Sequence, residues 1–406
     1  MKEYSKGVVT GIMGCLAIMM AVVLGLQVSG KADFSGVLAG NSAQVQEQRK
    51  IEAKAKTIKT YIDAYFLDSI DDTAMEDSIY KGIVAGLGDE YAAYYTADEY
   101  KEIKNKTSGT YYGIGAYVSQ DADTGAITIV KPMKDSYAEK AGLLAGDVLY
   151  EVEGEKVAGK DLSEVLALIK GEEGSKVKIK VARSGEKDYL EFSVTRGKIE
   201  EETVLYEMLD DGIGYVQITG FEEVTPKQFS AALEQLQKDG MTKLLLDLRD
   251  NGGGLLQSAV DMLDTLLPKG LLVYTEDSKD EGEKYYAQDD DQVNLPMAVL
   301  VNGNSASASE VFSGALQDKK KAVLVGTKTF GKGIVQTIFD MGDGSALKMT
   351  TSKYFTPNGR NIHGTGLDPD IQVELKKDTL NRKDKNGKSL PDNQMEKAIS
   401  YLKLAK

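Results

Sequence analysis

Three polar residues in the last third of the chain have types and spacing that suit acyl transfer by a serine. Ser307 lies between an apolar run at 295–301 and a segment with apolar residues at helical intervals, which predicts a strand-to-helix turn. A helix N-terminus directs backbone amides and partial positive charge at developing negative charge. Lys332 lies between two glycines, and Gln336 follows four residues later. If 331–336 forms a strand, Lys332 and Gln336 share one face, and the glycines leave room beside the lysine.

Ser307 has two interpretations. With Glu310 it forms an S-x-x-E capping box, in which the hydroxyl and the carboxylate satisfy backbone amides at the start of a helix. Alternatively it is a nucleophile, which requires a neighbouring base because a free serine hydroxyl is a weak nucleophile. The single histidine, His363, is one candidate base. Lys332 is the other, because burial disfavours the charged form of a lysine.

Two motifs resemble the active-site pattern of the C-terminal processing peptidases, or tail-specific proteases, which are serine proteases with a Ser–Lys dyad. They are S-A-S-A-S-E at 305–310 and T-F-G-K-G-I-V-Q at 329–336, and K-Y-F-T-P-N-G-R at 353–360 resembles a third stretch of that family. The resemblance extends from about Glu47 to the C-terminus. It implies that Ser307 is the nucleophile, Lys332 the general base and Gln336 the residue that orients the lysine. His363 is then a loop residue.

A triple-glycine loop follows a predicted buried strand at 242–249. The loop, D-N-G-G-G at 250–254, has no lysine in the Walker position, so it is not a phosphate-binding loop. A tight strand-to-helix turn is its simplest role. The family resemblance implies that such a loop also supplies an oxyanion-hole amide, together with the amide after the nucleophile. These donors are Ala308 and Gly253, with Gly254 as the alternative to Gly253.

Residues 107–198 have a different texture, with short alternating strands, one internal helix and many glycines. The segment A-G-L-L-A-G-D-V-L at 141–149 resembles PDZ domains of periplasmic proteases. PDZ domains add a peptide C-terminus as a strand at a sheet edge and hold its carboxylate with amides of a glycine-rich loop. That loop is assigned to Gly113, Ile114, Gly115 and Ala116. A simple turn before a strand is the alternative, and the absence of a third glycine excludes a dinucleotide fingerprint.

Composition excludes several classes of function. The 406 residues carry a net charge of −14, which argues against nucleic-acid binding because phosphates require a basic surface. One cysteine, Cys15, rules out an intramolecular disulfide framework, and with a single histidine it makes a structural zinc site unlikely to form. The expected mechanism needs no metal and no organic cofactor.

The N-terminus predicts a membrane anchor. Residues 7–30 contain no charged side chain and would span roughly 36 Å as a helix, enough to cross a bilayer. Lys2 and Lys6 precede this stretch, which places the N-terminus in the cytoplasm and the rest of the chain outside, in the bacterial envelope. A cleaved signal peptide is the alternative. A lipoprotein anchor at Cys15 is disfavoured, because the apolar run continues beyond it.

The predicted fold is an α/β protease core with a mixed sheet, an inserted α+β PDZ domain, an N-terminal helical region and the transmembrane helix. The predicted segments are 1–30 (stub and anchor), 31–106 (linker and helical region), 107–198 (PDZ), 199–375 (protease core) and 376–406 (linker and terminal helix). Residues 43–65 and 75–100 are expected to be helical, with a break at 86–89. An apolar stripe on the first of these serves either packing within the chain or a homodimer, and it consists of Ile51, Ala55, Ile58, Tyr61 and Ile62.

The sequence therefore predicts a membrane-anchored serine endopeptidase. Its PDZ domain would recognise unstructured apolar C-termini of proteins and would gate the site by swinging between positions. Two rivals remain: a PDZ scaffold that binds tails without cutting them, and a Ser-His-Asp hydrolase that uses His363.

Overall fold

The computed structural model describes residues 42–290, 292–380, 382–383 and 390–405, and they fall into two compact units that meet between Glu76 and Asp77. The predicted anchor or signal segment at 7–30 lies outside the described residues. Within the ranges that are described, no helix has both the length and the apolar character needed to cross a bilayer.

The first unit consists of helix α3 (Ser42–Tyr65) and the start of α4 (Asp72–Ala85). Lys59 pairs with Asp63 at 3.1 Å and with Asp72 at 2.9 Å, so one ion pair stabilises a turn of α3 and the other joins the two helices. Most of the predicted apolar stripe is exposed to solvent: Ile51 is 65% exposed, Ile58 52% and Tyr61 63%, whereas Ile62 is partly buried. Packing within this unit therefore does not account for the stripe.

The main sheet of the second unit has six strands in the order β10-β11-β12-β15-β16-β19. The strands are β10 (Val204–Met208), β11 (Ile213–Ile218), β12 (Lys243–Asp247), β15 (Met297–Val301), β16 (Ala322–Gly326) and β19 (Ile371–Gln372). Strand β10 runs antiparallel to β11, and all the other neighbours are parallel. The mixed sheet of an α/β core is therefore confirmed. A short 3₁₀ helix, η1 (Asp210–Gly212), precedes β11.

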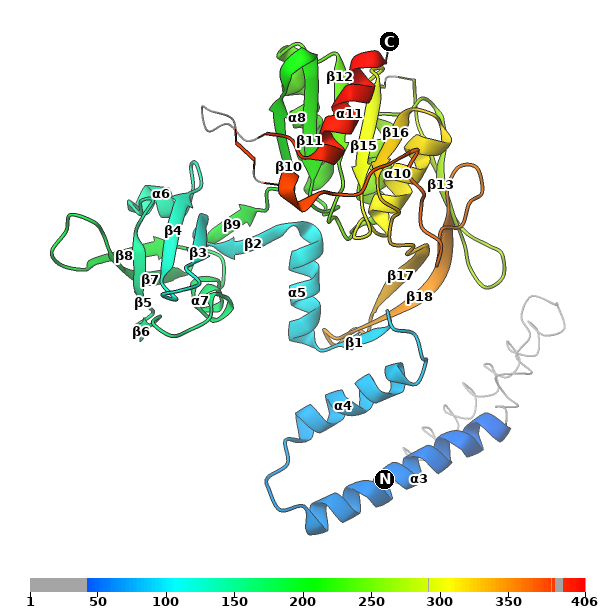
Figure 1. Ribbon diagram of the computed structural model, residues 1–406. Helices are drawn as coiled ribbons and strands as arrows, with labels where there is room; N and C mark the ends of the chain where they lie inside the picture. The colour runs from blue at the N-terminus through cyan, green and yellow to red at the C-terminus, as the bar shows by residue number, and fades with distance from the viewer. Residues whose placement is uncertain (1–41, 291, 381, 384–389, 406) are drawn as a thin grey trace, which may run out of the picture. The chain divides into compact units, whose positions relative to one another are not determined.

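Helices cover both faces of this sheet (Figure 1). The helices are α8 (Thr225–Lys238), α9 (Leu256–Asp264), α10 (Ala308–Asp318) and α11 (Asn393–Leu404), with a 3₁₀ helix, η2 (Lys377–Thr379), before the last. Leu244 and Leu246 join the core cluster that includes α8, α9 and α10, whereas Leu245 joins the cluster with α11. This alternation follows from the two-residue period of a strand.

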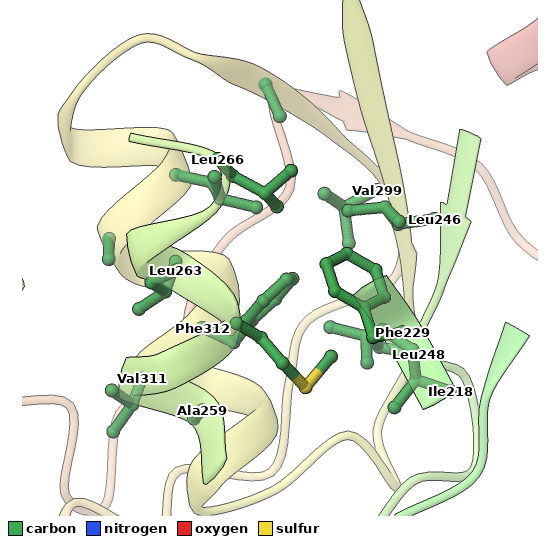
Figure 2. Packing of buried hydrophobic residues seen from close by; sticks show 14 of the residues in the cluster. Ile218, Phe229, Leu246, Leu248, Ala259, Leu263, Leu266, Val299, Val311 and Phe312 are labelled. Carbon is green, nitrogen blue, oxygen red and sulfur yellow. The ribbon is translucent and has the colours of Figure 1, made fainter. Parts of the chain in front are cut away.

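The larger core fixes the start of α10. Phe312 of α10 packs against Phe229 of α8 with ring centroids 6.4 Å apart, and both rings are fully buried (Figure 2). Burial of large aromatic side chains contributes strongly to core stability. The N-terminal end of α10, where Ser307 lies, is therefore held by one of the best-packed parts of the molecule.

A second sheet contains the strand that follows Lys332. Its order is β1-β18-β13-β14, with β17 paired to β18. The strands are β1 (Ala93–Tyr95), β13 (Gly270–Glu276), β14 (Lys284–Ala287), β17 (Ile334–Asp340) and β18 (Ala346–Phe355). The prediction of helix at 75–100, with a break at 86–89, is wrong for part of the segment after the break, because Ala93–Tyr95 pair with Ala346–Lys348 as a strand. A Thr96–Glu99 capping box then starts a separate helix, α5 (Ala97–Ser108).

A third sheet has its own hydrophobic core. Its order is β3-β4-β5-β7-β8, with β6 paired to β5. The elements are β3 (Ala116–Gln120), β4 (Ile127–Pro132), α6 (Tyr137–Ala141), β5 (Val148–Val152), β6 (Glu155–Lys156), α7 (Leu162–Ile169), β7 (Lys176–Ala182) and β8 (Leu190–Thr195). Strands β2 (Thr110–Gly113) and β9 (Gly197–Glu200), at its two chain ends, pair with each other. Strand β3 lies at one end of the strand order and has a free edge.

Candidate active site

The nucleophile candidate occupies a constrained turn between β15 and α10. Ser307 is the N-cap of α10 and has φ 56° and ψ −118°. A non-glycine residue in this region carries strain on the order of 1–3 kcal/mol, and such residues persist only where the surroundings hold them. The turn is expected from the sequence, but this backbone geometry is visible only in the structure.

The two serines on either side of Ser307 hold that turn in place. Ser305 Oγ donates to the carbonyl of Leu248 at 2.7 Å, and Ser309 Oγ donates to the carbonyl of Asn251 at 2.9 Å. Both serines are fully buried. Because their acceptors follow β12, these two hydrogen bonds fasten the Ser307 turn to the triple-glycine loop. The three serines of the motif thus differ, because Ser305 and Ser309 hold the turn whereas Ser307 lines a cavity.

Glu310 connects the nucleophile to the base segment, residues 329–333, which carries Lys332. Its Oε2 accepts from the backbone N of Ser307 at 3.0 Å, as a capping box requires, and also from the backbone N of Lys332 at 2.8 Å. Its Oε1 accepts from the backbone N of Gly331 at 2.7 Å and from Thr329 Oγ1 at 2.5 Å. Four donors around a fully buried carboxylate satisfy its hydrogen-bonding needs. Of these contacts, the capping-box interpretation predicted only the one with the backbone N of Ser307.

Tyr354 makes a second connection that sequence reasoning missed. Its hydroxyl donates to the carbonyl oxygen of Ser307 at 3.0 Å and lies in close contact with the carbonyl oxygen of Lys332. Burial, together with the charge of Glu310, holds the pKa of Tyr354 well above its ordinary value, so the hydroxyl keeps its proton. Tyr354 belongs to the K-Y-F-T-P-N-G-R motif, which marked the segment without indicating a role.

Lys332 does not lie in a strand. Strand β17 begins at Ile334, and a bulge between Val335 and Gln336 interrupts its pairing with β18. The predicted strand at 331–336, with Lys332 and Gln336 on one face, is therefore wrong in its first half. A β-bulge re-aims the side chains around it, so the strand period does not fix how these two residues point.

Gly333, which follows Lys332, has a different structural role from the expected one. A Cβ on Gly333 would lie 2.4 Å from the backbone N of His363, too close for any side chain. The glycine therefore lets the base segment contact the turn that begins at His363, instead of leaving room beside the lysine. His363 itself is exposed, and its backbone N donates to Asn361 Oδ1 at 3.1 Å.

The amine of Lys332 is half-buried and partly desolvated. Burial, and secondarily the charge of Lys348, lower its pKa below the ordinary 10.5, while Asp89 and Glu90 oppose this. Its Nζ lies 4.4 Å from the centroid of the Tyr91 ring. Among the hydrogen bonds of the described residues, none joins this amine to Ser307 or Gln336. A lowered pKa is the property a lysine base requires.

A cavity of about 150 Å³ lies beside Ser307. Its lining is mostly apolar and consists of Gly254, Leu255, Leu256, Ser307, Ala308, Val311, Ile334, Val335, Gln336 and Tyr354. Of the predicted site residues, Ser307, Ala308 and Gln336 therefore meet at one cavity, whereas Lys332 does not line it. Gln336 Nε2 is buried and has no hydrogen-bond partner among the described residues.

The two glycines proposed for the oxyanion hole are placed differently. A Cβ on Gly253 would lie 2.6 Å from the carbonyl oxygen of Ala306 and 2.9 Å from the backbone N of Ala308, so the loop packs directly on the nucleophile turn. However, the amide of Gly253 already donates to Asn251 Oδ1 at 2.8 Å. Gly254 lines the cavity together with Ala308. The geometry therefore favours Gly254 over Gly253 as the second donor.

The predicted carboxylate loop, Gly113 to Ala116, leads from β2 into the edge strand β3. The carbonyl of Ile114 accepts from the backbone N of Ala138 at 2.7 Å, and that of Gly115 accepts from Met133 at 2.9 Å. Gly115 has φ 74°, and a Cβ there would lie 2.6 Å from that of Ser136. Two carbonyls of the loop thus accept hydrogen bonds from the segment at 133–138. The loop leads into β3, whose outer edge is free to pair with another strand.

No group of three or more His, Cys, Asp or Glu side chains in the described part of the chain is arranged to hold a metal ion.

Known proteins resemble this chain over most of its length. Residues 212–373 match peptidase family S41, and residues 128–183 match a PDZ domain. A probable CtpA-like serine protease of Staphylococcus haemolyticus is 38% identical over 366 residues, which are 88% of this chain and 72% of that protein. The carboxy-terminal processing protease CtpA of Bacillus subtilis is 36% identical over 363 residues, 89% of this chain and 76% of that protein.

A solved structure of a photosystem II D1 C-terminal processing protease shares 31% identity, with a TM-score of 0.46 over 79% of this chain and 86% of that chain. The two sequence relatives are more than 30% identical, and this chain covers more than two thirds of each. The chain therefore belongs to peptidase family S41, the carboxy-terminal processing serine proteases, and carries a PDZ domain.

Proposed function

We propose that this serine peptidase cleaves proteins that end in unstructured apolar tails, with Ser307 as nucleophile and Lys332 as general base. One observation carries the proposal above all others. Glu310 and Tyr354 each bond to the backbone of both Ser307 and Lys332, so two buried side chains fix the two segments against each other. The apolar cavity of about 150 Å³ beside Ser307 supports an apolar side chain next to the cleaved bond.

The reaction follows from these placements. Neutral Lys332 takes the proton of Ser307 Oγ as that oxygen attacks the peptide carbonyl, and then gives it to the leaving amine. The amides of Ala308 and Gly254 stabilise the oxyanion, and Gln336 holds the lysine amine in line with the serine. Water then hydrolyses the acyl-enzyme and regenerates Ser307. Gln336 Nε2, which is buried without a partner, is available for this contact.

The PDZ domain would select the substrate. A tail would add as a strand to the free edge of β3, with its terminal carboxylate at Gly113 to Ala116. Backbone amides supply affinity in this mode without fixing the tail sequence. A change in the position of the PDZ domain would then couple tail binding to access to Ser307.

We place the catalytic part of the chain outside the cytoplasm, on a single N-terminal membrane segment at 7–30. The uncharged length of that segment and the preceding Lys2 and Lys6 support this orientation. A homodimer formed through α3 accounts for its exposed apolar side chains, because a contiguous exposed apolar face marks an interaction surface. Chemical cross-linking of wild type and of Ile58→Asp, each on its own, tests the dimer. Wild type should form a covalent dimer, and Ile58→Asp should not.

The test of the activity compares wild type with Ser307→Ala, Lys332→Ala and His363→Ala. Each full-length protein, in detergent, is incubated with a folded reporter that ends in an apolar tail, and gels follow cleavage. Loss of the nucleophile or base lowers kcat by roughly 10⁴–10⁶ in serine proteases. We expect the serine and lysine variants to be inactive and the histidine variant to be active.

The rival functions predict different results. Inactive His363→Ala with active Lys332→Ala would establish the Ser-His-Asp alternative. Wild type that binds the tail without cutting it, even at alkaline pH, would indicate a scaffold.

A further inference from the structure

The loop between α4 and β1 contacts Lys332, and the proposed Ser–Lys chemistry does not itself require this contact. The ring of Tyr91 lies under the amine of Lys332, 4.4 Å from Nζ to the ring centroid. Asp89 holds the loop: its Oδ1 accepts from the backbone N of Tyr91 at 2.9 Å and its Oδ2 accepts from the backbone N of Thr350 at 3.1 Å. Thr350 pairs with Gln336 across β17 and β18. The loop therefore contacts both Lys332 and the strand partner of Gln336.

The groups that face Lys332 divide into two sets. The carboxylates of Asp89 and Glu90 favour the charged amine, whereas burial and Lys348 favour the neutral one. Glu310 and Tyr354 bond to the backbone of Lys332 and leave its amine unengaged. The amine of Lys332 thus lies on the ring of Tyr91.

An aromatic ring attracts an ammonium group through its quadrupole, and a neutral amine loses that attraction. The contact with Tyr91 therefore stabilises the form of Lys332 that cannot act as a base. Deprotonation, which creates the base, also weakens the contact that keeps the amine on the ring. Protonation of Lys332 therefore both removes its basicity and holds its amine on the ring.

We propose that Tyr91 is a positioning residue that holds the amine of Lys332 on its ring, in competition with Ser307. The inference rests on the proposed role of Lys332 as the base and names a regulator of that role. Movement of the loop at 89–91 would then change how readily the lysine reaches the serine. The same loop would act on Gln336 through Asp89 and Thr350.

The experiment measures the rate at which a fluorophosphonate probe labels Ser307, from neutral to alkaline pH, in the full-length protein. This small probe needs no recognition by the PDZ domain. Tyr91→Leu removes the ring, Tyr91→Phe keeps it, and trifluorophenylalanine at position 91 keeps its shape but withdraws electron density from its face. Tyr100→Leu is the matched control, because Lys104 lies 4.1 Å from the centroid of Tyr100 in a contact within α5 that involves neither Ser307 nor Lys332.

We expect labelling of Tyr91→Leu and of the fluorinated protein to be about threefold to tenfold faster than wild type near neutral pH, a range that a partly desolvated cation–π contact covers. The rates should converge at alkaline pH, where Lys332 is neutral in every protein. Tyr91→Phe and Tyr100→Leu should follow the wild-type pH dependence. Identical pH dependence in the fluorinated protein and wild type would overturn the proposal, and this holds even if Tyr91→Leu fails to fold.

Lys332→Ala in the same assay separates the two claims. If it labels as fast as wild type, Lys332 is not the base and the proposed function fails. If it does not label while all Tyr91 variants match wild type, the base assignment stands and only the role of Tyr91 is wrong.

Discussion

The two halves of the proposed dyad differ in how the fold holds them. Ser307 lies in a turn whose flanking serines, backbone amide and carbonyl all make hydrogen bonds to buried partners. The backbone of Lys332 is held equally well, by Glu310 and Tyr354. Its amine, in contrast, lies on an aromatic ring, and the neighbouring Gln336 Nε2 has no partner among the described residues.

This contrast indicates where the enzyme can be regulated at low energetic cost. Moving Ser307 would break several buried hydrogen bonds, each of which costs about 1–3 kcal/mol when a partner is left unsatisfied. Moving the amine of Lys332 breaks a cation–π contact, worth on the order of 0.5–2 kcal/mol, and changes its distance from the charges of Asp89 and Glu90. The nucleophile is therefore preorganised, and the position of the base is the adjustable part of the site.

The largest effect is expected at the link between the two halves. Glu310→Ala should lower the free energy of unfolding by about 3–5 kcal/mol, because it leaves four buried donors without an acceptor. Denaturant titration measures the loss, and activity should disappear with it. Glu234→Ala, at an exposed site in α8, should change the free energy by less than about 0.5 kcal/mol. Equal effects at the two sites would show that Glu310 does not join the segments.

The next largest effect is expected at the hydroxyl of Tyr354, which contacts the carbonyls of Ser307 and Lys332. Tyr354→Phe should lower the free energy of unfolding by about 1–2 kcal/mol and should lower kcat more than it changes KM, because it removes the hydroxyl that aligns the dyad and keeps the ring. Steady-state kinetics on the tailed reporter measure the two constants, and because the Tyr354 ring also lines the cavity, only the phenylalanine variant, which keeps the ring, isolates the hydroxyl. Tyr206→Phe, at an exposed site in β10, is the control. A change confined to KM would contradict an aligning role.

A smaller effect should reveal the strain at the nucleophile. Ser307→Gly and Ser307→Ala are both expected to be inactive, but the glycine variant should be the more stable by about 1 kcal/mol. Glycine adopts φ 56° freely, and this gain exceeds the entropy that glycine loses on folding. Thermal unfolding of the two variants side by side is the measurement. A less stable glycine variant would mean that the turn is unstrained.

The smallest effect is expected at the base. Because the native pKa of Lys332 is lowered, its charged form destabilises the native state below that pKa, and the penalty disappears as pH rises toward 10.5. Lys332→Met should therefore be slightly more stable than wild type at neutral pH, and the difference should shrink as the solution becomes alkaline. Chemical denaturation at several pH values tests this sign. A difference that grows with pH would contradict a lowered pKa.

Local patterns were sufficient for much of the fold. Apolar runs of strand length found β12 and β15, and helical spacing found α10, because burial on one or both faces leaves a direct mark on residue order. The prediction failed at Ala93–Tyr95, where three residues became a strand through pairing with β18. Such a short segment has little preference of its own, so a distant partner decides its conformation.

The sequence by itself determined the family, the PDZ domain and the three residues nominated for catalysis, because their types and spacing form contiguous motifs. Tertiary structure alone decided how these residues are held. Glu310 reaches Lys332 across 22 residues of chain, Tyr354 reaches Ser307 across 47, and Tyr91 meets Lys332 from a loop before the PDZ domain. Contacts between segments so far apart leave no periodic signal in the chain, because only the packed sheets and helices bring their side chains together.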